Sequence, residues 1–289
     1  MPRTDILPER GAGITPRRVV APASARHSVA GLWPHLRRPL LSILRLIMPL
    51  GSILGLWYLA ILFSGLPAFV LPRPERVVAC LIHDRRFIAI QALSTIEVSA
   101  LGLLIANIAG IGLAVLFDAL PPARAVLMPA AITLRNMPYV ALTTVLMLAL
   151  GDTISTKVTV VALAGFFPVL VNTMQGLRAA DTVMLDRMRV LNASWFQTFR
   201  LVRLPYALPA IISAQETAAT GSIIVAISAE WMISSSGLGY VINRGMQNYR
   251  GDQVYAVALL ATVLSFGVYT LVRQIGRRLD WRDRPVSTH

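Results

Sequence analysis

Few residues of this chain have the type and spacing needed for covalent chemistry. Cys80 is the only cysteine, so an internal disulfide is excluded, and the four histidines lack the spacing of metal ligands. No G-x-x-x-x-G-K-[ST] phosphate loop is present, and no nucleophile and base are paired by pattern. We therefore expect no enzymatic activity, no metal and no cofactor in this chain.

A few polar residues fall inside long apolar runs, where they are costly and typical of a path through a membrane. Arg135 and Asn136, followed by Pro138, interrupt one run, and Glu216 and Glu230 lie within another. Polar or non-helical backbone at membrane depth is tolerated only against protein or a water-filled cavity. These four polar residues, Arg135, Asn136, Glu216 and Glu230, are therefore candidates for a translocation path. Two alternatives stay open: Arg135 extends to the membrane surface, or it pairs with Glu216, which is the interpretation we favour for Glu216.

The composition indicates a polytopic membrane protein. Hydrophobic residues make up 55% of the 289 and charged residues only 14%, against about a quarter in soluble domains. The net charge is +13, but the arginines lie between apolar runs and are not gathered on one soluble face, which excludes nucleic acid as a partner. The fold class is thus all-α, a bundle embedded in lipid.

About six transmembrane helices are expected after a basic tail at residues 1–40, with the membrane domain at 41–289. The predicted spans are residues 46–63, 93–117, 125–150, 158–174, 206–233 and 254–272. Between them we expect a surface segment with a short helix at 66–91 and loops at 151–157 and 234–252. Most positive charges then fall on the side that holds both termini, which predicts cytoplasmic termini.

The polar stretch Asp181–Pro209 is predicted to form a helical hook on that same side. Asn192 tolerates the left-handed conformation that ends a helix. Ser194 and Gln197 have the spacing of a capping box for a second helix, which Pro205 should end. Trp195 and Phe196 would lie near the tip. A helix lying flat on the membrane surface is the alternative.

The hook resembles the EAA loop of ABC-importer permeases. Asp186-Arg187-Met188 stands at the E-A-A position, Asn192 at the glycine, and Val202-Arg203-Leu204-Pro205 at the final I-x-L-P, with the spacing intact and the residues divergent. The segments GFFPVLVNTMQGLRAAD (165–181), SSSGLGYVI (234–242) and ALGD…TK (149–157) are similar to the nitrate, sulfonate and taurine branch of these permeases. The resemblance covers most of the chain, with a family-like core at about 90–280.

The resemblance implies a type I ABC importer permease of a bacterial inner membrane. Its expected partners are two ABC ATPase subunits that hold ATP and Mg²⁺, an extracytoplasmic solute-binding protein, membrane lipid and a second permease copy. It also implies that Glu230 belongs to the shared framework. The expected solute is small and anionic or sulfonate-like. The residues expected to couple to the ATPase are Asp186, Asn192, Ser194, Trp195, Phe196, Arg200, Arg203 and Pro205, the two arginines by pairing with acidic groups there.

The main alternative is a secondary, proton-coupled transporter in which acidic residues relay protons. No inverted repeat is evident in the sequence, and such a protein would leave the hook unexplained.

Small residues recur every four positions along the second predicted span, at Gly102, Ala106, Gly110 and Ala114. Such a stripe lets another helix approach closely in a membrane. We expect it to pack within the protomer rather than across a dimer axis.

Overall fold

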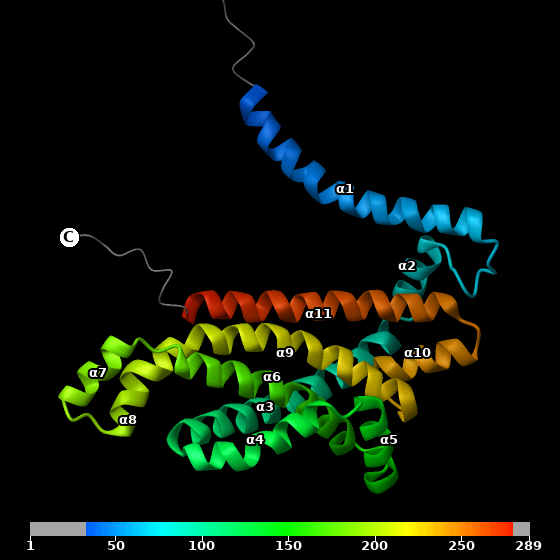
Figure 1. Ribbon diagram of the computed structural model, residues 1–289. Helices are drawn as coiled ribbons and strands as arrows, with labels where there is room; N and C mark the ends of the chain where they lie inside the picture. The colour runs from blue at the N-terminus through cyan, green and yellow to red at the C-terminus, as the bar shows by residue number, and fades with distance from the viewer. Residues whose placement is uncertain (1–32, 280–289) are drawn as a thin grey trace, which may run out of the picture. The chain divides into compact units, whose positions relative to one another are not determined.

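The computed structural model describes residues 33–279, and within them the chain is almost entirely helical (Figure 1). It divides into two units, residues 1–56 and 57–289, and the first helix, α1 (Trp33–Ser64), crosses the boundary. The remaining helices belong to the second unit. They are α2 (Pro74–His83), α3 (Arg85–Ala119), α4 (Pro121–Arg135), α5 (Tyr139–Leu150), α6 (Ile154–Arg178), α7 (Thr182–Val190), α8 (Trp195–Thr198), α9 (Leu204–Ile233), α10 (Leu238–Gln247) and α11 (Gly251–Leu279).

The expectation of a polytopic helical bundle is confirmed. Within the described residues, four helices are long and apolar enough to cross a membrane, or five if the pair α4 and α5 counts as one bent span. The last part of α1, Gly51–Ser64, covers most of the first predicted span and is apolar, but it is shorter than the four helices that qualify. Many large apolar side chains of the long helices are exposed, as expected where lipid is the solvent.

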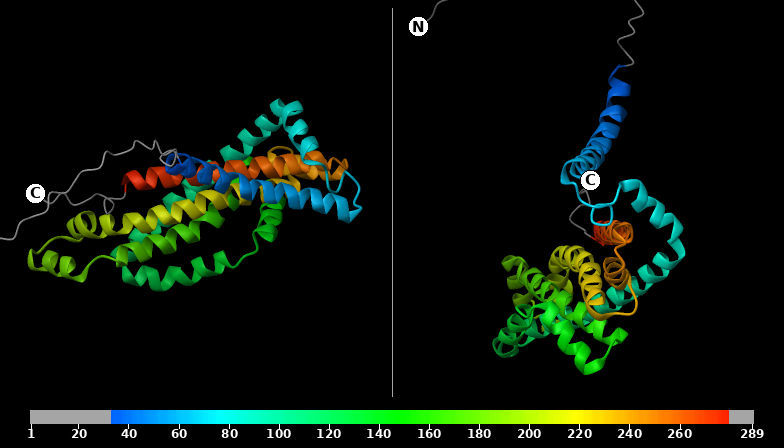
Figure 2. Two further views of the ribbon diagram at one scale, coloured as in Figure 1. Left: turned by 90° about the horizontal axis from the view of Figure 1, so that it is seen from above. Right: turned by 90° about the vertical axis from the view of Figure 1, so that its right-hand side faces the viewer.

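The core of the second unit is built from three helices, α3, α6 and α9, and α6 packs against both of the others. The left view of Figure 2 shows α6 running alongside α9. The small-residue stripe of α3, Gly102, Ala106, Gly110 and Ala114, is buried at every position. A Cβ at Gly102 would lie 2.5 Å from Val161, and one at Gly110 would lie 2.9 Å from Val169, both on α6. The stripe therefore brings α3 and α6 into close contact inside the protomer.

The third predicted span is broken where its sequence is interrupted. Helices α4 and α5 meet at 95°, with Asn136 at the end of α4 and Pro138 at the start of α5. Proline lacks the amide hydrogen that a continuing helix would need, and it disfavours helix at the residue before it. The break is thus fixed by the local sequence.

Three sequence expectations need correction. Residues 234–252 are not all loop, because α10 lies within them, and α6 begins at Ile154, inside the loop expected at 151–157. Pro205 does not end the second hook helix. A π-helical turn (Phe199–Arg203) joins α8 to α9, so the helix runs unbroken from Trp195 to Met232. In that turn the Leu204 amide donates to Phe199 O, five residues back, and a widened turn accommodates a residue without an amide hydrogen.

Candidate functional site

The hook (Asp181–Pro209) begins with α7, which the sequence caps at both ends. The Asp181 side chain accepts a hydrogen bond from the Val183 amide at 3.0 Å. At the other end Asn192 has φ +52°, and the Ala193 and Asn192 amides donate to Met188 O and Arg189 O, each at 3.0 Å. This is the Schellman arrangement, whose left-handed residue is usually glycine and sometimes asparagine. The corner expected at Asn192 is therefore left-handed.

The second hook helix begins with a complete capping box. The Gln197 amide donates to Ser194 Oγ at 3.3 Å, and the Ser194 amide donates to Gln197 Oε1 at 2.7 Å. The two reciprocal bonds satisfy amide groups that a helix start otherwise leaves unpaired. They fix the direction in which the next two residues, Trp195 and Phe196, project.

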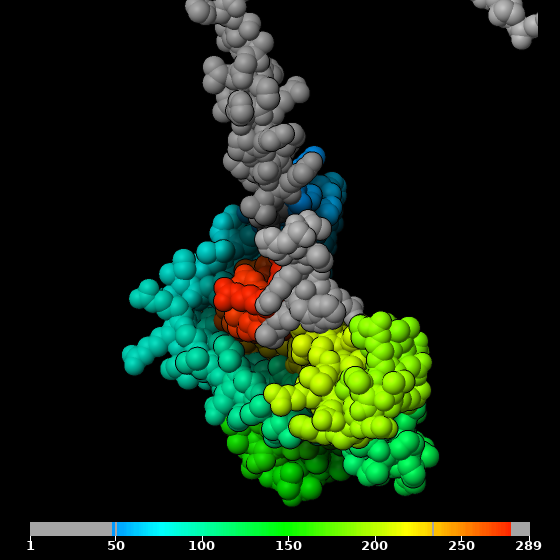
Figure 3. Space-filling view, turned by 90° about the vertical axis from the view of Figure 1, so that its left-hand side faces the viewer, coloured from blue at the N-terminus to red at the C-terminus, as the bar shows by residue number. Residues whose placement is uncertain are grey.

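The tip of the hook is apolar and uncovered. Trp195 is 42% exposed and stacks on Phe199, and Phe196 is 61% exposed. No residue of α7 is buried, and within the part of the chain that the structure describes Asp186 pairs only with the exposed Arg189 of the same helix. In Figure 3, which looks onto this end of the molecule, the hook (yellow-green) forms a lobe of its own. An exposed aromatic pair on a rigid helix start is the usual composition of an anchor for a partner protein.

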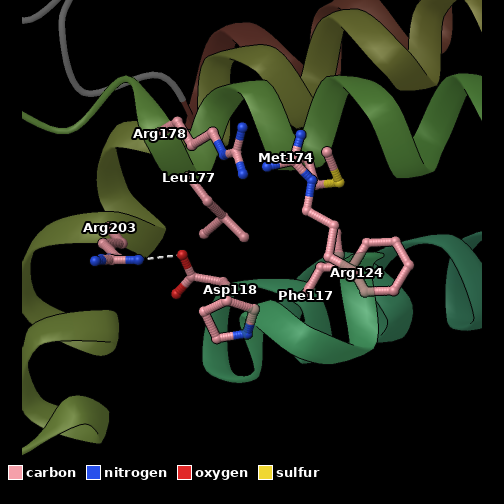
Figure 4. A pocket seen from close by; sticks show the side chains of 9 residues that line it. Phe117, Asp118, Arg124, Met174, Leu177, Arg178 and Arg203 are labelled. Atoms are coloured by element: carbon pink, nitrogen blue, oxygen red, sulfur yellow. Dashed lines mark hydrogen bonds and ion pairs between the residues drawn. The ribbon is translucent and has the colours of Figure 1, made fainter. Parts of the chain in front are cut away.

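Arg203, which was expected to pair with an acidic group of the ATPase, has an acidic partner within its own protomer. Its guanidinium forms an ion pair with the carboxylate of Asp118, in the last turn of α3 (Figure 4). Of the two arginines expected to meet acidic groups of an ATPase, only Arg200 is exposed. Arg203, two residues before Pro205, thus joins the start of α9 to α3.

The four candidate path residues do not form one cluster. Arg135 and Asn136 are exposed at the break between α4 and α5, and the Arg135 guanidinium lies 4.8 Å from the centre of the Phe167 ring. Glu216 is half-buried on α9 and has no ion pair within residues 33–279, so the pairing with Arg135 is not formed. The cation of Arg135 is instead held by an aromatic face.

Glu230 is completely buried and holds the turn between α9 and α10. Its Oε2 accepts hydrogen bonds from Thr95 Oγ1 at 2.8 Å and from the Gly239 amide at 3.1 Å. Thr95 Oγ1 in turn accepts from the Leu238 amide at 2.8 Å. A Cβ at Gly237, where φ is +95°, would overlap the Glu230 carboxylate. The framework interpretation of Glu230 therefore fits the geometry better than a place on a path.

The same turn is held from a second side by residues that the sequence interpretation did not single out. Lys157 Nζ donates to Ser234 Oγ at 2.6 Å and pairs with Asp152 at 3.0 Å, and Asp152 Oδ2 accepts from the Ser235 amide and hydroxyl. Partial burial opposes ionisation of Asp152, but the bonds from Ser235 and Lys157 outweigh it and lower the pKa of its carboxyl.

Cys80, singled out as the lone cysteine, lies buried on α2. Its Sγ is 3.7 Å from both Asp84 and Arg250, and burial together with Asp252 and Asp84 raises the pKa of the thiol to about 11. A thiol with so high a pKa is not a nucleophile near neutral pH. Within residues 33–279, no group of three or more His, Cys, Asp or Glu is placed to hold a metal ion.

Residues 102–281 match the family of binding-protein-dependent transport system inner membrane components, and the chain belongs to that family. It is 29% identical to a Bacillus subtilis protein whose name assigns it to aliphatic sulfonates transport, over 82% of this chain and 87% of that protein. It is 26% identical to the formylaminopyrimidine transport permease protein of Halalkalibacterium halodurans, over 79% of this chain and 92% of that one.

Solved structures show the same fold. An amino acid ABC transporter chain superposes with a TM-score of 0.59 at 17% identity, covering 70% of this chain and 98% of that one. A chain of a bacterial alginate importer gives 0.58 at 14% identity, covering 86% and 98%. The fold is that of the type I ABC importer permeases, and the chain is an ABC importer permease subunit of the bacterial inner membrane. Permeases of this class work with a separate ATPase and a substrate-binding protein.

Proposed function

We propose that this permease receives the motion of its ATPase through the hook. One observation carries the proposal: the exposed pair Trp195 and Phe196 starts a helix that continues without a break through the bundle to Met232. An aromatic anchor on a short loop would move by itself, whereas a helix start transmits a displacement along its whole length. The anchor would fill an apolar cleft of the ATPase, and Arg200 would pair with an acidic group beside it.

The contacts at the base of the hook support a lever. Val202, in the π-helical turn, is buried, and Arg203 is bound to Asp118 at the end of α3. The helix that carries the anchor is therefore connected to α3 where it enters the bundle. A displacement of the tip would turn α9 and α3 together, and α6 would follow because the small-residue stripe packs α3 against it.

We further propose that two copies of the chain form one transporter, with both termini in the cytoplasm. One protomer has a single hook, and two copies related by a twofold axis would present one hook to each of two ATPase subunits. The arginine-rich termini and the hook then lie on the cytoplasmic side, in line with the positive-inside rule.

The proposed solute is small and anionic or sulfonate-like. The Bacillus subtilis relative is named for aliphatic sulfonates, and the formylaminopyrimidine relative shows that similar sequences are named for other solutes. The bent pair of α4 and α5 supports a path, because Arg135 and Asn136 interrupt an apolar span there. The cationic Arg135 would favour an anion.

The anchor is tested by Trp195→Ala combined with Phe196→Ala in the full-length permease. The matched control is Leu259→Ala with Phe266→Ala on α11, an aliphatic and aromatic pair of similar exposure at 45% and 65%. We expect the hook variant to bind the purified ATPase roughly 30-fold or more weakly, since anchors of this kind contribute about 2 kcal/mol or more. The control should bind normally, and both variants should keep the wild-type melting temperature. Normal ATPase binding by the hook variant would overturn the proposal.

The solute class is tested separately by reconstituting the permease with its ATPase and binding protein in vesicles. Uptake of an alkyl sulfonate, with no uptake of a betaine or an amino acid, is the expected result. Transport of a cationic or neutral solute in place of the sulfonate would contradict the solute class and leave the role of the hook intact.

A further inference from the structure

A basic pocket lies where four helices of the second unit end or begin, and the coupling proposal does not use it as a binding site. Its volume is about 380 Å³, and the lining residues are Ala114, Phe117, Asp118, Pro121, Arg124, Met174, Leu177, Arg178 and Arg203. Asp118 belongs to the last turn of α3, Arg178 ends α6, and Arg124 is in the first turn of α4. Because α3 and α6 are both long and apolar enough to cross a membrane and both end here, we expect the pocket at the depth of the membrane–water interface, where phospholipid phosphates lie.

The pocket carries an excess of positive charge. Three guanidinium groups face one carboxylate, and Asp118 neutralises only Arg203. Arg124 and Arg178 form no ion pair within the described residues, and in Figure 4 their side chains extend over the pocket from α4 and α6. Two unpaired guanidinium groups at one cavity are suited to an anion that both can bind, and arginine matches the oxygens of phosphate particularly well.

The Asp118 carboxylate in the pocket sets a second requirement for a ligand. The side chain of Asp118 is 8% exposed, and its Oδ2 is buried without a hydrogen-bond partner within the described chain, as is Arg203 Nε. A buried carboxylate oxygen without a donor is costly, so a ligand of this pocket should bring one. The ligand must then combine an anionic group for Arg124 and Arg178 with a hydrogen-bond donor a few ångströms away.

We propose that the basic pocket binds a phosphate ester that carries a neighbouring hydroxyl group, and that its source is the headgroup of an anionic phospholipid such as phosphatidylglycerol. The phosphate lies between Arg124 and Arg178, and a rotation of the Asp118 carboxylate toward the pocket lets a glycerol hydroxyl donate to its Oδ2. The apolar side of the pocket, with Phe117, Met174 and Leu177, contacts the start of the acyl chains. Basic pockets between transmembrane helices on the cytoplasmic side are the usual sites for anionic headgroups.

Native mass spectrometry of the full-length permease in detergent tests the site, with phosphatidylglycerol, phosphatidylcholine and soluble glycerol phosphate added in separate arms. Phosphatidylcholine has the phosphate but no donor, and glycerol phosphate has both groups but no acyl chains. We expect retention of phosphatidylglycerol well above phosphatidylcholine. Preferential retention of glycerol phosphate would keep the phosphate site and overturn its assignment to lipid.

The variant is Arg124→Ala with Arg178→Ala, and the matched control is Arg277→Ala with Arg278→Ala, an exposed pair in the last turn of α11. Each arginine near an anionic headgroup contributes about a fivefold factor, so the pocket variant, which lacks two, should bind phosphatidylglycerol roughly 30-fold more weakly. The control should bind it as the wild type does. Equal binding by both variants, or equal retention of the two lipids by the wild type, would overturn the proposal. A melting temperature recorded for each variant shows that it is folded.

Discussion

The two ends of α9 (Leu204–Ile233) differ in how they are held. At its C-terminal end, the turn from Ser234 to Gly237 is fixed by Glu230 and Thr95 on one side and by Asp152 and Lys157 on the other. At its N-terminal end, the hook leaves every residue of α7 unburied and exposes its aromatic tip. One end is part of the packed framework, while the other leaves its aromatic side chains exposed. A lever needs this difference, because a displacement at the free end must work against a fixed end.

The largest expected effect is the loss of Glu230. Glu230→Ala leaves Thr95 Oγ1 and the Gly239 amide without their buried acceptor and opens a cavity beside them, which should cost about 3 kcal/mol. The melting temperature in detergent should then fall by roughly 10 °C. Glu216→Ala is the control on the same helix, since Glu216 is half-buried and has no ion pair within residues 33–279. An equal fall in melting temperature for both variants would show that Glu230 matters no more to the fold than another carboxylate of α9.

Much of the hook could be predicted because its chemistry is local. The bonds of the corner at Asn192 and of the Ser194–Gln197 capping box join residues no more than five apart, so their spacing alone indicates both features. The exception is Pro205, where a π-helical turn allows a helix that a proline usually stops. Val202 in that turn is buried against the bundle, and local sequence does not contain that contact.

The framework end and the base of the hook were less predictable, because the residues that pair there are far apart in the chain. Thr95 and Glu230 are 135 residues apart, and Asp118 and Arg203 are 85 apart. One signal was available: the small-residue stripe of α3 continues in both directions as polar residues on the same face. Ser99, Thr95 and Gln91 precede it and Asp118 follows it, and each of the four bonds to α9 or the segments next to it. The spacing of these residues along α3 shows which face of the helix is packed, but it does not show which segment packs against that face.

The next largest effect should come from the middle of that face. A Cβ at Gly110 would lie 2.9 Å from Val169 and 3.0 Å from Phe166 O, whereas one at Gly112 would meet nothing within 4 Å. Gly110→Leu should therefore separate α3 from α6, cost about 2 kcal/mol and lower the melting temperature, while Gly112→Leu should not. Crosslinking in membranes reports whether each variant still dimerises. A stable, monomeric Gly110→Leu protein would place the stripe at a dimer interface.

A smaller effect is expected at the corner of the hook. Asn192→Gly should be neutral or slightly favourable, because glycine adopts positive φ without steric cost. Asn192→Val should cost about 1 kcal/mol, since a β-branched residue resists that conformation. Hydrogen exchange of the Ala193 amide, which donates to Met188 O, should then be roughly fivefold faster in the Val variant. The melting temperature of the whole protein should not change, because the hook is not part of the framework.

The smallest expected effect is a loss of thermal stability at acid pH, and it should differ between charged groups at the two ends of α9. The pKa of Asp152 is lowered in the folded protein by its bonds to Ser235 and Lys157, which outweigh partial burial. Its contribution to stability is therefore complete above the unfolded pKa, near pH 4, and is lost as the pH falls through the lower folded value. Between pH 6 and pH 3 the melting temperature of the wild type should fall further than that of Asp152→Asn, whose side chain does not titrate. Asp186→Asn in the hook is the matched control, because Asp186 pairs with an exposed arginine of its own helix and such pairs contribute little. It should follow the wild-type curve, and a curve like that of Asp152→Asn would show that acid does not act through the fixed end of α9.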